Sequence, residues 1–584
     1  MPVGDLIRAN AADPGRAGRV FLRFNEACIT FAEYYAESIR WANLLLRMRS
    51  SGPQAPTPSG PFHVGVLLDN TPDYFYALGG AALAGAVVVG INNTKRGAYL
   101  ARDIAYTDCQ FLITEDKYRP FLDPVLAEMG VPPARVLVTR RWNDAHDASV
   151  PQAAQAVGAA YRDLDAALAQ LGDGPDPCAP VGDRDTYILV FTSGTVTAPK
   201  AVQCSHGRLL ETGKTIGANV YQLTPDDAGY IAMPLFHANA LMCGFMPALC
   251  YGVPLGMIRK FSKRRWLGDI RRYGATFFNY TGKPLAYILS TPHLPDDHVN
   301  PLRICYGNEG SHQVVAEFEA RFGCRVTDVF GSTEGGVGVI RQPGDPPGCV
   351  GFPAPGIIVV DEHGNERPPA RFDASGCLLD ADACVGEIVN TQGLGWFEGY
   401  YRNPEALQQR TRNGWYWTGD LGYKDERGFL YFAGRDIEWL RVDGENFVAR
   451  PIEEILHRYP EVILAAVYGV PDPDGGDRVM AALILRDGTA FDPAGFAAFL
   501  RAQPDLSPKW MPSYLRISRE LPQTATAKIL KTELRRQKFR VDRCPDPIYW
   551  RLRTDDEFRP FTAQDQEQLQ ARFAAVGRLA ILEI

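Results

Sequence analysis

One loop of the sequence combines the residue types that bind an anion. It reads "TSGTVTAPK" and follows the apolar run "TYILVF". Its hydroxyl groups can donate hydrogen bonds to an anion, its glycine permits a left-handed backbone on which successive N–H groups converge, and its lysine adds positive charge. The residues concerned are Thr192, Ser193, Gly194, Thr195 and Lys200. Taken alone, such a segment is also an ordinary turn, so a phosphate site is one of two interpretations.

A second polar turn places a carboxylate beside a hydroxyl group. In "VFGSTEGGVG", Glu334 follows Thr333, and Phe330 precedes both with a flat aromatic face. Magnesium prefers one or two carboxylates together with substrate oxygens, so Glu334 is a candidate magnesium ligand. The ring of Phe330 is a candidate platform for a purine. The alternative interpretation is a glycine-rich hairpin with a solvated glutamate.

Two more turns carry charged groups that could act on the same ligand. Asp420 lies in "WTGD" between aromatic residues, and a carboxylate can accept hydrogen bonds from both hydroxyls of a ribose. Arg435 could add positive charge along the same edge. Lys528 follows the polar loop "LPQTATA" and precedes a predicted helix. Separately, these residues are also typical of a turn aspartate and a solvated surface lysine.

The elements that must position these turns belong to an α/β protein of several units. The chain has 584 residues, whereas a single core stops growing near ~250–300 residues. Short β-branched runs alternate with helical patterns in the first half, which is typical of parallel α/β layers. After about Val350 the pattern favours antiparallel sheet, and from Arg435 it favours a small α+β segment. We therefore predict domains at residues 1–434 and 435–540, with a helical, polar tail at 541–584.

Composition excludes several classes of protein. A net charge of −7 and a pI near 5.8 give no bulk attraction to nucleic acid or anionic lipid. The twelve cysteines include no C-x-x-C pair, so we expect reduced, mostly buried thiols. The N-terminus has no apolar core, so we expect a cytoplasmic protein without a signal peptide. The uncharged run Tyr74–Ile91 is long enough for a membrane span, but its Gly and Ala content favours a buried helix, a turn and a strand.

The order of the motifs resembles that of a known family. In sequence they are "TSGT…PK", "PLFHANAL", "FGSTE", "TGD", "GR", "GEN" and the loop lysine. Together they resemble the adenylate-forming enzymes, which include acyl-CoA synthetases, firefly luciferase and the adenylation domains of peptide synthetases. The resemblance runs from Phe31 to Leu534, and "GYYRNPEALQQRTRNGWYWTGDLG" is most similar to the long- and very-long-chain fatty-acyl-CoA synthetases. It implies a large N-terminal domain of layered α/β subdomains with a β-rich subdomain, and a small mobile α+β C-terminal domain.

The resemblance also implies a role for each candidate residue. Lys528 would bridge the acyl carboxylate and the α-phosphate of ATP, and Thr333 would contact that phosphate. Glu334 would bind Mg²⁺, and His237 would lie at the entrance of the carboxylate pocket. The predicted ATP and AMP ligands are Thr192, Ser193, Gly194, Thr195, Lys200, Gly307, Asn308, Phe330, Gly331, Asp420 and Arg435. The predicted hinge residues are Asp436 and Ile437.

The implied activity is an ATP-dependent acyl-CoA synthetase with coenzyme A as co-substrate. A hydrophobic fatty acid would be activated as acyl-AMP in a pocket near His237, residues 277–284 and residues 335–340, and then transferred to CoA. A sterol side-chain acid and a carrier-protein acceptor remain alternatives, as does a fatty-acid-binding protein without catalysis. Retention of Glu334, Asp420 and Lys528 argues against the last. Peripheral membrane association stays open because the substrate partitions into lipid, and the oligomeric state stays open as well.

Overall fold

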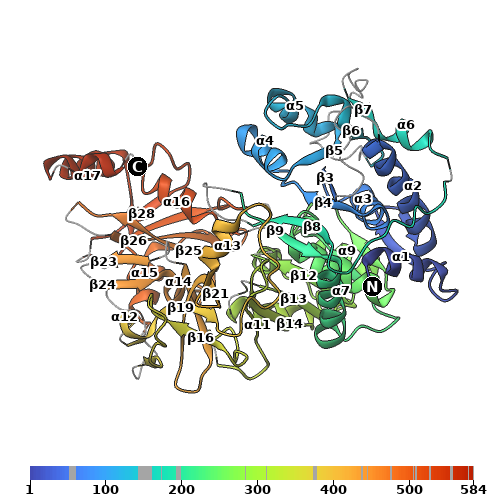
Figure 1. Cartoon of the computed structure of the whole chain (residues 1–584). Helices are drawn as coiled ribbons and strands as arrows, with labels where there is room; N and C mark the ends of the chain where they lie inside the picture. Colours follow the sequence, from blue (N-terminus) through green and yellow to red (C-terminus); the bar gives the residue numbers. More distant parts are fainter. Residues whose placement is uncertain are drawn as a thin grey trace.

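The computed structural model describes most of the chain, and Figure 1 shows its course. The ranges described are 1–50, 61–142, 161–172, 174–192, 199–282, 284–308, 310, 312–346, 348–372, 378–379, 381–435, 439–442, 445–473, 477–503, 506, 509–524, 528–552, 555, 557–576 and 578–582. Among the predicted site residues, five lie outside these ranges: Ser193, Gly194, Thr195, Asp436 and Ile437.

The first sheet has seven strands in the order β7-β6-β5-β3-β4-β8-β9, and only the β8–β9 pair is antiparallel. The strands are β3 (Phe62–Leu67), β4 (Ala86–Gly90), β5 (Cys109–Glu115), β6 (Val136–Thr139), β7 (Arg162–Asp163), β8 (Thr186–Phe191) and β9 (Ala201–Ser205). The accompanying helices are α1 (Val3–Ala12), α2 (Phe31–Ser50), α3 (Pro72–Ala84), α4 (Gly97–Tyr106), α5 (Arg119–Leu122) and α6 (Leu164–Ala169), with short 3₁₀ turns η1 (Asp116–Tyr118), η2 (Asp123–Val125) and η3 (Pro133–Arg135).

The uncharged run Tyr74–Ile91 forms the interior of this layer. Every residue of α3 and of β4 is buried, and Gly85 at the turn between them has φ +68°. A strand buried on both faces needs a continuous apolar sequence, which "AVVVG" supplies. The predicted helix, turn and strand are therefore confirmed. Within the described ranges, no helix is long and apolar enough to cross a membrane.

The second sheet has eight strands in the order β15-β14-β13-β12-β10-β11-β1-β2, parallel except at its two edge pairs. The strands are β1 (Val20–Phe24), β2 (Ala27–Thr30), β10 (Gly229–Ile231), β11 (Leu255–Met257), β12 (Phe277–Thr281), β13 (Ile304–Asn308), β14 (Arg325–Gly331) and β15 (Gly338–Ile340). Its helices are α7 (His206–Thr215), α8 (Met246–Tyr251), α9 (Trp266–Tyr273), α10 (Pro284–Leu289) and α11 (His312–Phe322), with two π-helical segments, η4 (Ile216–Tyr221) and η5 (Ala240–Phe245).

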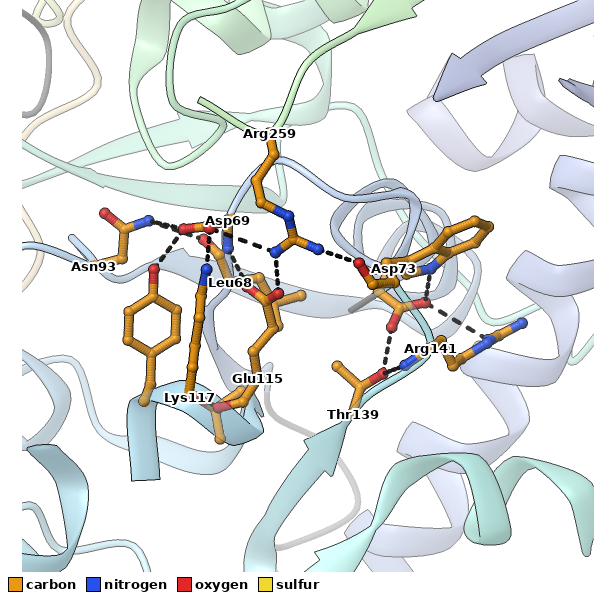
Figure 2. A network of polar contacts seen from close by, with 12 residues as sticks. Leu68, Asp69, Asp73, Asn93, Glu115, Lys117, Thr139, Arg141 and Arg259 are labelled. Atoms are coloured by element: carbon orange, nitrogen blue, oxygen red, sulfur yellow. Dashed lines mark hydrogen bonds and ion pairs between the residues drawn. The ribbon is translucent and has the colours of Figure 1, made fainter. Parts of the chain in front are cut away.

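A buried network of charges joins the two sheets (Figure 2). Arg259 follows β11 of the second sheet and reaches the carboxyl ends of β3 and β5 in the first, where it pairs with Glu115 and lies 3.4 Å from Asp69. Lys117 also pairs with Asp69. The four side chains are between 1% and 9% exposed, so two buried carboxylates are balanced by two cations. Since loss of either partner would leave a buried charge, this network fixes how the two sheets meet.

A β-rich unit follows, as predicted from the change of pattern near Val350. Its sheet has the order β16-β19-β21-β20, and β22 pairs with β21. The strands are β16 (Ile357–Val360), β19 (Gly386–Asn390), β20 (Thr411–Arg412), β21 (Trp415–Lys424) and β22 (Leu430–Arg435), with a separate pair β17 (Arg371–Phe372) and β18 (Leu378–Leu379) and the helices α12 (Ala381–Cys384) and α13 (Pro404–Arg410).

The C-terminal segment, orange to red in Figure 1, is an α+β unit. Its sheet has the order β25-β26-β27-β28-β29, and β23–β24 form a separate hairpin. The elements are β23 (Trp439–Val442), β24 (Glu445–Val448), α14 (Ala449–Leu456), β25 (Val462–Pro471), β26 (Asp477–Leu485), α15 (Pro493–Arg501), β27 (Tyr514–Ser518), α16 (Lys531–Gln537), β28 (Ile548–Trp550), β29 (Arg559–Pro560), α17 (Ala563–Ala575) and the 3₁₀ turn η7 (Leu579–Leu582). The tail that was expected to be helical thus also supplies two outer strands of this sheet. The predicted fold class, layered α/β units with a β-rich unit and a small α+β unit, is confirmed.

Three polar contacts hold this segment against the second sheet's helices. Arg486 pairs with Glu317 at 2.6 Å, and Lys263 lies 3.3 Å from Asp487. The hydroxyl of Tyr287 donates to Oε1 of Gln523 at 2.9 Å. Gln523 belongs to the loop that precedes α16, so this last contact holds the loop that carries Lys528 beside the N-terminal sheets.

Candidate active site

A cavity of about 660 Å³ gathers most of the predicted site residues. It opens at the carboxyl ends of β8, β13 and β14, where loops of parallel α/β sheets commonly bind ligands. Lys528, which precedes α16 in the C-terminal segment, also lines it. Ten predicted residues line it: Thr192, Lys200, His237, Gly307, Asn308, Phe330, Gly331, Thr333, Glu334 and Lys528.

Two predicted residues lie in the neighbouring β-rich sheet. Asp420 is buried in β21, and its neighbour Gly419 lines the cavity while Asp420 itself does not. Residue 435 ends β22 directly opposite Asp420 in the antiparallel register. The strand pairing therefore brings these two sequence positions side by side, as the sequence interpretation requires.

The predicted phosphate loop connects the antiparallel strands β8 and β9. The N–H of Thr192 donates to the carbonyl of Lys200 at 3.1 Å, so the loop leaves and re-enters the sheet at one point. The ammonium of Lys200 lies 5.7 Å from the ring centroid of Tyr400. Partial burial lowers the pKa of Lys200, and the nearby positive charge of Arg410 lowers it further. An anion bound in the cavity would raise the pKa of Lys200 again, because its negative charge favours the protonated amine.

Glu334 is buried at the centre of this charged group. Its Oε1 accepts a hydrogen bond of 2.8 Å from the hydroxyl of Tyr400. Burial, and then the charge of Glu334, raise the pKa of Tyr400, so this hydroxyl stays protonated as a donor. Arg410 also lines the cavity and donates to the carbonyl of Trp417 at 3.2 Å. The sequence reasoning missed Tyr400 and Arg410, although both lie in the stretch that carries the family resemblance.

Arg208 fixes the turn that presents Thr333 and Glu334. This residue of α7 is buried, and its Nη2 donates to the carbonyls of Thr333 at 2.5 Å and Glu334 at 2.9 Å. Its Nη1 donates to the carbonyl of Gln203 at 3.2 Å. Because the planar guanidinium spans three carbonyls, it locks the turn to α7 and β9. No sequence pattern links this arginine to a turn so far along the chain.

The side of the cavity near β13 and β14 is lined by Gly307, Asn308 and the aromatic ring of Phe330. Phe330 lines it and packs against Phe432, with ring centroids 5.6 Å apart. A side chain at Gly307 would collide with the carbonyl of Tyr280, so this glycine serves close strand packing as well as the cavity wall. The amide oxygen of Asn308 accepts a hydrogen bond from the hydroxyl of Thr281.

The opposite wall of the cavity follows α7 into two adjacent π-helical segments. The hydroxyl of Tyr221 in η4 donates to the carbonyl of Cys243 in η5 at 2.8 Å, which joins the two segments. Wide π turns are frequent at functional sites. The residues that line this wall and the facing turn are Arg208, Thr212, Thr215, Ile216, Ala238, Met242, Cys243, Tyr306, Val337 and Gly338. Of residues 335–340, which are expected near an acyl pocket, Gly335, Val337 and Gly338 line the cavity.

His237 lines the cavity, and its Nδ1 accepts a hydrogen bond of 3.3 Å from the N–H of Asn239. Lys528 approaches from the C-terminal segment, and its backbone is held by Thr524, whose hydroxyl accepts from Lys528 N–H at 3.1 Å. Lys528 thus lines the same cavity as His237, although it belongs to the C-terminal segment.

Family models match two parts of the chain. Residues 8–401 match the model described as "AMP-binding enzyme", and residues 451–528 match "AMP-binding enzyme C-terminal domain".

Two characterised relatives are equally similar in sequence. The steroid-22-oyl-CoA synthetase of Rhodococcus jostii is 44% identical over 528 residues, which cover 90% of this chain and 91% of that protein. The medium/long-chain-fatty-acid–CoA ligase FadD17 of Mycobacterium tuberculosis is 44% identical over 498 residues, which cover 85% of this chain and 90% of that protein.

Solved structures share the fold at lower sequence identity. The anthranilate CoA ligase AuaEII in complex with anthranoyl-AMP superimposes with a TM-score of 0.75 at 21% identity, covering 92% of this chain and 96% of that one. ATP-bound MatB from Rhodopseudomonas palustris superimposes with a TM-score of 0.73 at 23% identity, covering 93% and 100%.

Proposed function

The chain belongs to the family of AMP-binding enzymes and is an ATP-dependent acid–thiol ligase for hydrophobic acids, and from this premise we propose which of its residues perform the reaction. The resemblance to adenylate-forming enzymes inferred from the motifs is confirmed, and ATP, CoA and a carboxylic acid are the substrates. The observation that carries the residue assignment is the convergence of Lys528 with Thr333 and Glu334 on one cavity.

The first step activates the acid. A carboxylate oxygen attacks the α-phosphorus of ATP, a carbon–oxygen–phosphorus anhydride forms, and pyrophosphate leaves. Lys528 neutralises charge shared between the carboxylate and the α-phosphate, and the hydroxyl of Thr333 donates to that phosphate. Lys200, beside Arg410, faces the departing pyrophosphate. Catalysis here depends on position and charge, and removal of one such contact commonly slows a reaction by about 10²–10³.

Magnesium fits the donor set at Glu334. Within the described ranges, no cluster of three or more His, Cys, Asp or Glu could cage a metal. Magnesium bound through one carboxylate, phosphate oxygens and water needs no such cage. The hydrogen bond from Tyr400 holds the carboxylate in one orientation. When bound, the ion would offset negative charge on the phosphates.

Other residues orient the nucleotide for the second step. Asp420 accepts hydrogen bonds from the ribose hydroxyls, with Arg435 beside it in the strand pair. Phe330, Gly331, Gly307 and Asn308 enclose the adenine. The sulfur of CoA then attacks the acyl carbonyl, a thioester forms, and AMP leaves. His237 borders the carboxylate, while Asp436 and Ile437 remain the predicted hinge between the domains at 1–434 and 435–540.

The acid is proposed to carry a large apolar group. The wall formed by the two π-helical segments and the turn at residues 335–338 carries the apolar or small residues Ile216, Met242, Cys243, Gly335, Val337 and Gly338. One relative is named for steroid-22-oyl-CoA and another for medium- and long-chain fatty acids. A ring system and a long chain are therefore the two acids to compare directly.

Acid-dependent exchange between ATP and pyrophosphate tests the assignment of Lys528. For Lys528→Ala we expect exchange to fall by at least about 10², while thioester formation from supplied acyl-AMP and CoA is retained. Lys214→Ala is the control, because Lys214 is an exposed lysine that pairs with Glu211 on the surface of α7. If both half-reactions fall equally, or if neither changes, the role given to Lys528 is wrong.

A further inference from the structure

Trp396 is an exposed aromatic residue at the edge of the active-site cavity. It lies in the connection between β19 and α13, lines the cavity and is 55% exposed. A tryptophan that leaves over half of its surface in water has unused apolar area, because this side chain contributes strongly when it is covered. Its position at a cavity rim indicates that a ligand supplies the cover.

The backbone of Trp396 is held against the turn that follows Glu334. The N–H of Trp396 donates to the carbonyl of Gly335 at 3.1 Å. Gly395 has φ +59°, and a Cβ atom there would lie 3.0 Å from the carbonyl oxygens of both Gly335 and Gly336. Gly335 has φ +73°, and its Cβ would lie 3.1 Å from Cβ of Trp396. Each glycine permits this close contact and the left-handed backbone. Trp396 is therefore fixed to the turn that directly follows Glu334.

The surroundings of Trp396 place it on the acyl side of the cavity. Arg208 lies 3.0 Å from the Cβ position of Gly335, and the wall continues from Arg208 along α7 through Thr212 to Thr215. The facing turn ends at Gly338. Thr215 and Gly338 are both exposed, so this wall reaches solvent. Trp396 contacts the Gly335 end of the turn that runs to Gly338, so an apolar group that extends from the reacting carboxylate along this wall would pass the indole.

We propose that Trp396 packs against the part of the acyl group farthest from the carboxylate, and that it selects acids large enough to reach this edge of the cavity. This inference rests on the proposed function. A short acid ends inside the cavity and gains nothing from the indole. A long chain or a ring system covers its face and removes apolar surface from water. Trp396 is then a specificity-determining residue that takes no part in bond making.

Steady-state kinetics with acids of different size test this proposal. For Trp396→Ala, we expect KM for palmitate and for a steroid-22-oic acid to rise roughly tenfold, which corresponds to about 1.4 kcal/mol. KM for hexanoate, KM for ATP and kcat stay unchanged, and Trp396→Phe keeps most of the selectivity. Phe352→Ala is the matched control, because Phe352 is 62% exposed but does not line the cavity.

The outcomes separate this proposal from the function on which it rests. If the unsubstituted protein forms no AMP with any of these acids, the proposed function and the role of Trp396 both fail. If it turns over the large acids and Trp396→Ala changes all KM values equally, or changes none, the ligase stands and the inference about Trp396 is wrong. A comparable rise in KM for Phe352→Ala would likewise overturn it.

Discussion

Replacement of Asp73 by asparagine tests how burial changes the pKa of a carboxyl group beside the seven-stranded sheet. Asp73 is completely buried at the start of α3. Its Oδ1 accepts from Nε1 of Trp142 at 2.9 Å, and its Oδ2 accepts from the hydroxyl of Thr139 at 2.7 Å (Figure 2). Arg141 lies 3.6 Å away. That guanidinium is shared with Glu37 at 2.7 Å and with Asp165 at 3.7 Å.

The burial of Asp73 outweighs its favourable contacts. Desolvation raises its pKa from 3.8 to about 6, although Arg141, Thr139 and Trp142 each oppose the rise. Because the folded pKa is above the unfolded one, the folded protein keeps this proton to higher pH. Stability is therefore lost as pH rises from about 4 to about 6 and stays constant above that. A shift of about two units corresponds to roughly 3 kcal/mol.

Asparagine cannot ionise, so Asp73→Asn removes this pH dependence. Relative to the unsubstituted protein, the variant should gain roughly 3 kcal/mol in unfolding free energy between pH 4 and pH 7.5. The amide of asparagine can lose part of the hydrogen bonding to Trp142 or Thr139. This loss of free energy does not depend on pH, so it cancels when the values at pH 4 and pH 7.5 are subtracted. Thermal unfolding of both proteins across this pH range measures the trend.

The indole N–H of Trp142 reports the same titration directly. In protein labelled with ¹⁵N-tryptophan, its resonance should shift with a midpoint near pH 6 and should not titrate in Asp73→Asn; Trp142→Phe assigns the signal. A midpoint below pH 4, or a stability difference that shrinks as pH rises, would mean that Arg141 and the two donors outweigh burial. Either result would refute the reasoning.

Two further predictions concern buried arginines. Arg259→Met removes the buried cation that pairs with Glu115 and Asp69, so the free energy of unfolding should fall by about 3–5 kcal/mol. The control is Arg271→Met in the exposed Arg271–Asp296 pair, which should lower the free energy of unfolding by less than about 1 kcal/mol. Equal falls in the thermal midpoint would contradict this. Arg208→Lys cannot span the three carbonyls that hold the Thr333–Glu334 turn, so kcat should fall by about 10–10² with folding retained, whereas Lys214→Met on the same helix should leave kcat unchanged. An unchanged kcat for Arg208→Lys would show that the turn holds itself.

The local patterns were sufficient to predict the layers of the fold. The run from Tyr74 to Ile91 is continuous in apolar character, which suits a helix and a strand that are buried on all sides in a folded core. The change of pattern near Val350 likewise predicted the antiparallel β-rich unit. The tail after Val541 was less predictable, because β28 and β29 are two- or three-residue strands whose pairing depends on β27 rather than on their own sequence.

Some residues of the candidate site have a local sequence signal, and others do not. Thr192, Thr333, Glu334 and Lys528 were found from the sequence because each lies in a short turn whose residue types already suit phosphate, metal or carboxylate chemistry. Arg208 and Tyr400 carry no such local signal. They act through contacts with residues far along the chain, and only the folded backbone brings those partners within hydrogen-bond distance.

The sequence by itself determined the family and predicted the reacting groups, because ordered motifs encode chemistry in contiguous residues. The tertiary structure alone decided which other residues hold the candidate groups in place and which residues line the cavity. Arg208 of α7 donates to the carbonyl of Glu334, and the N–H of Trp396 donates to the carbonyl of Gly335. Such contacts depend on distances in space, which residue spacing along the chain does not specify.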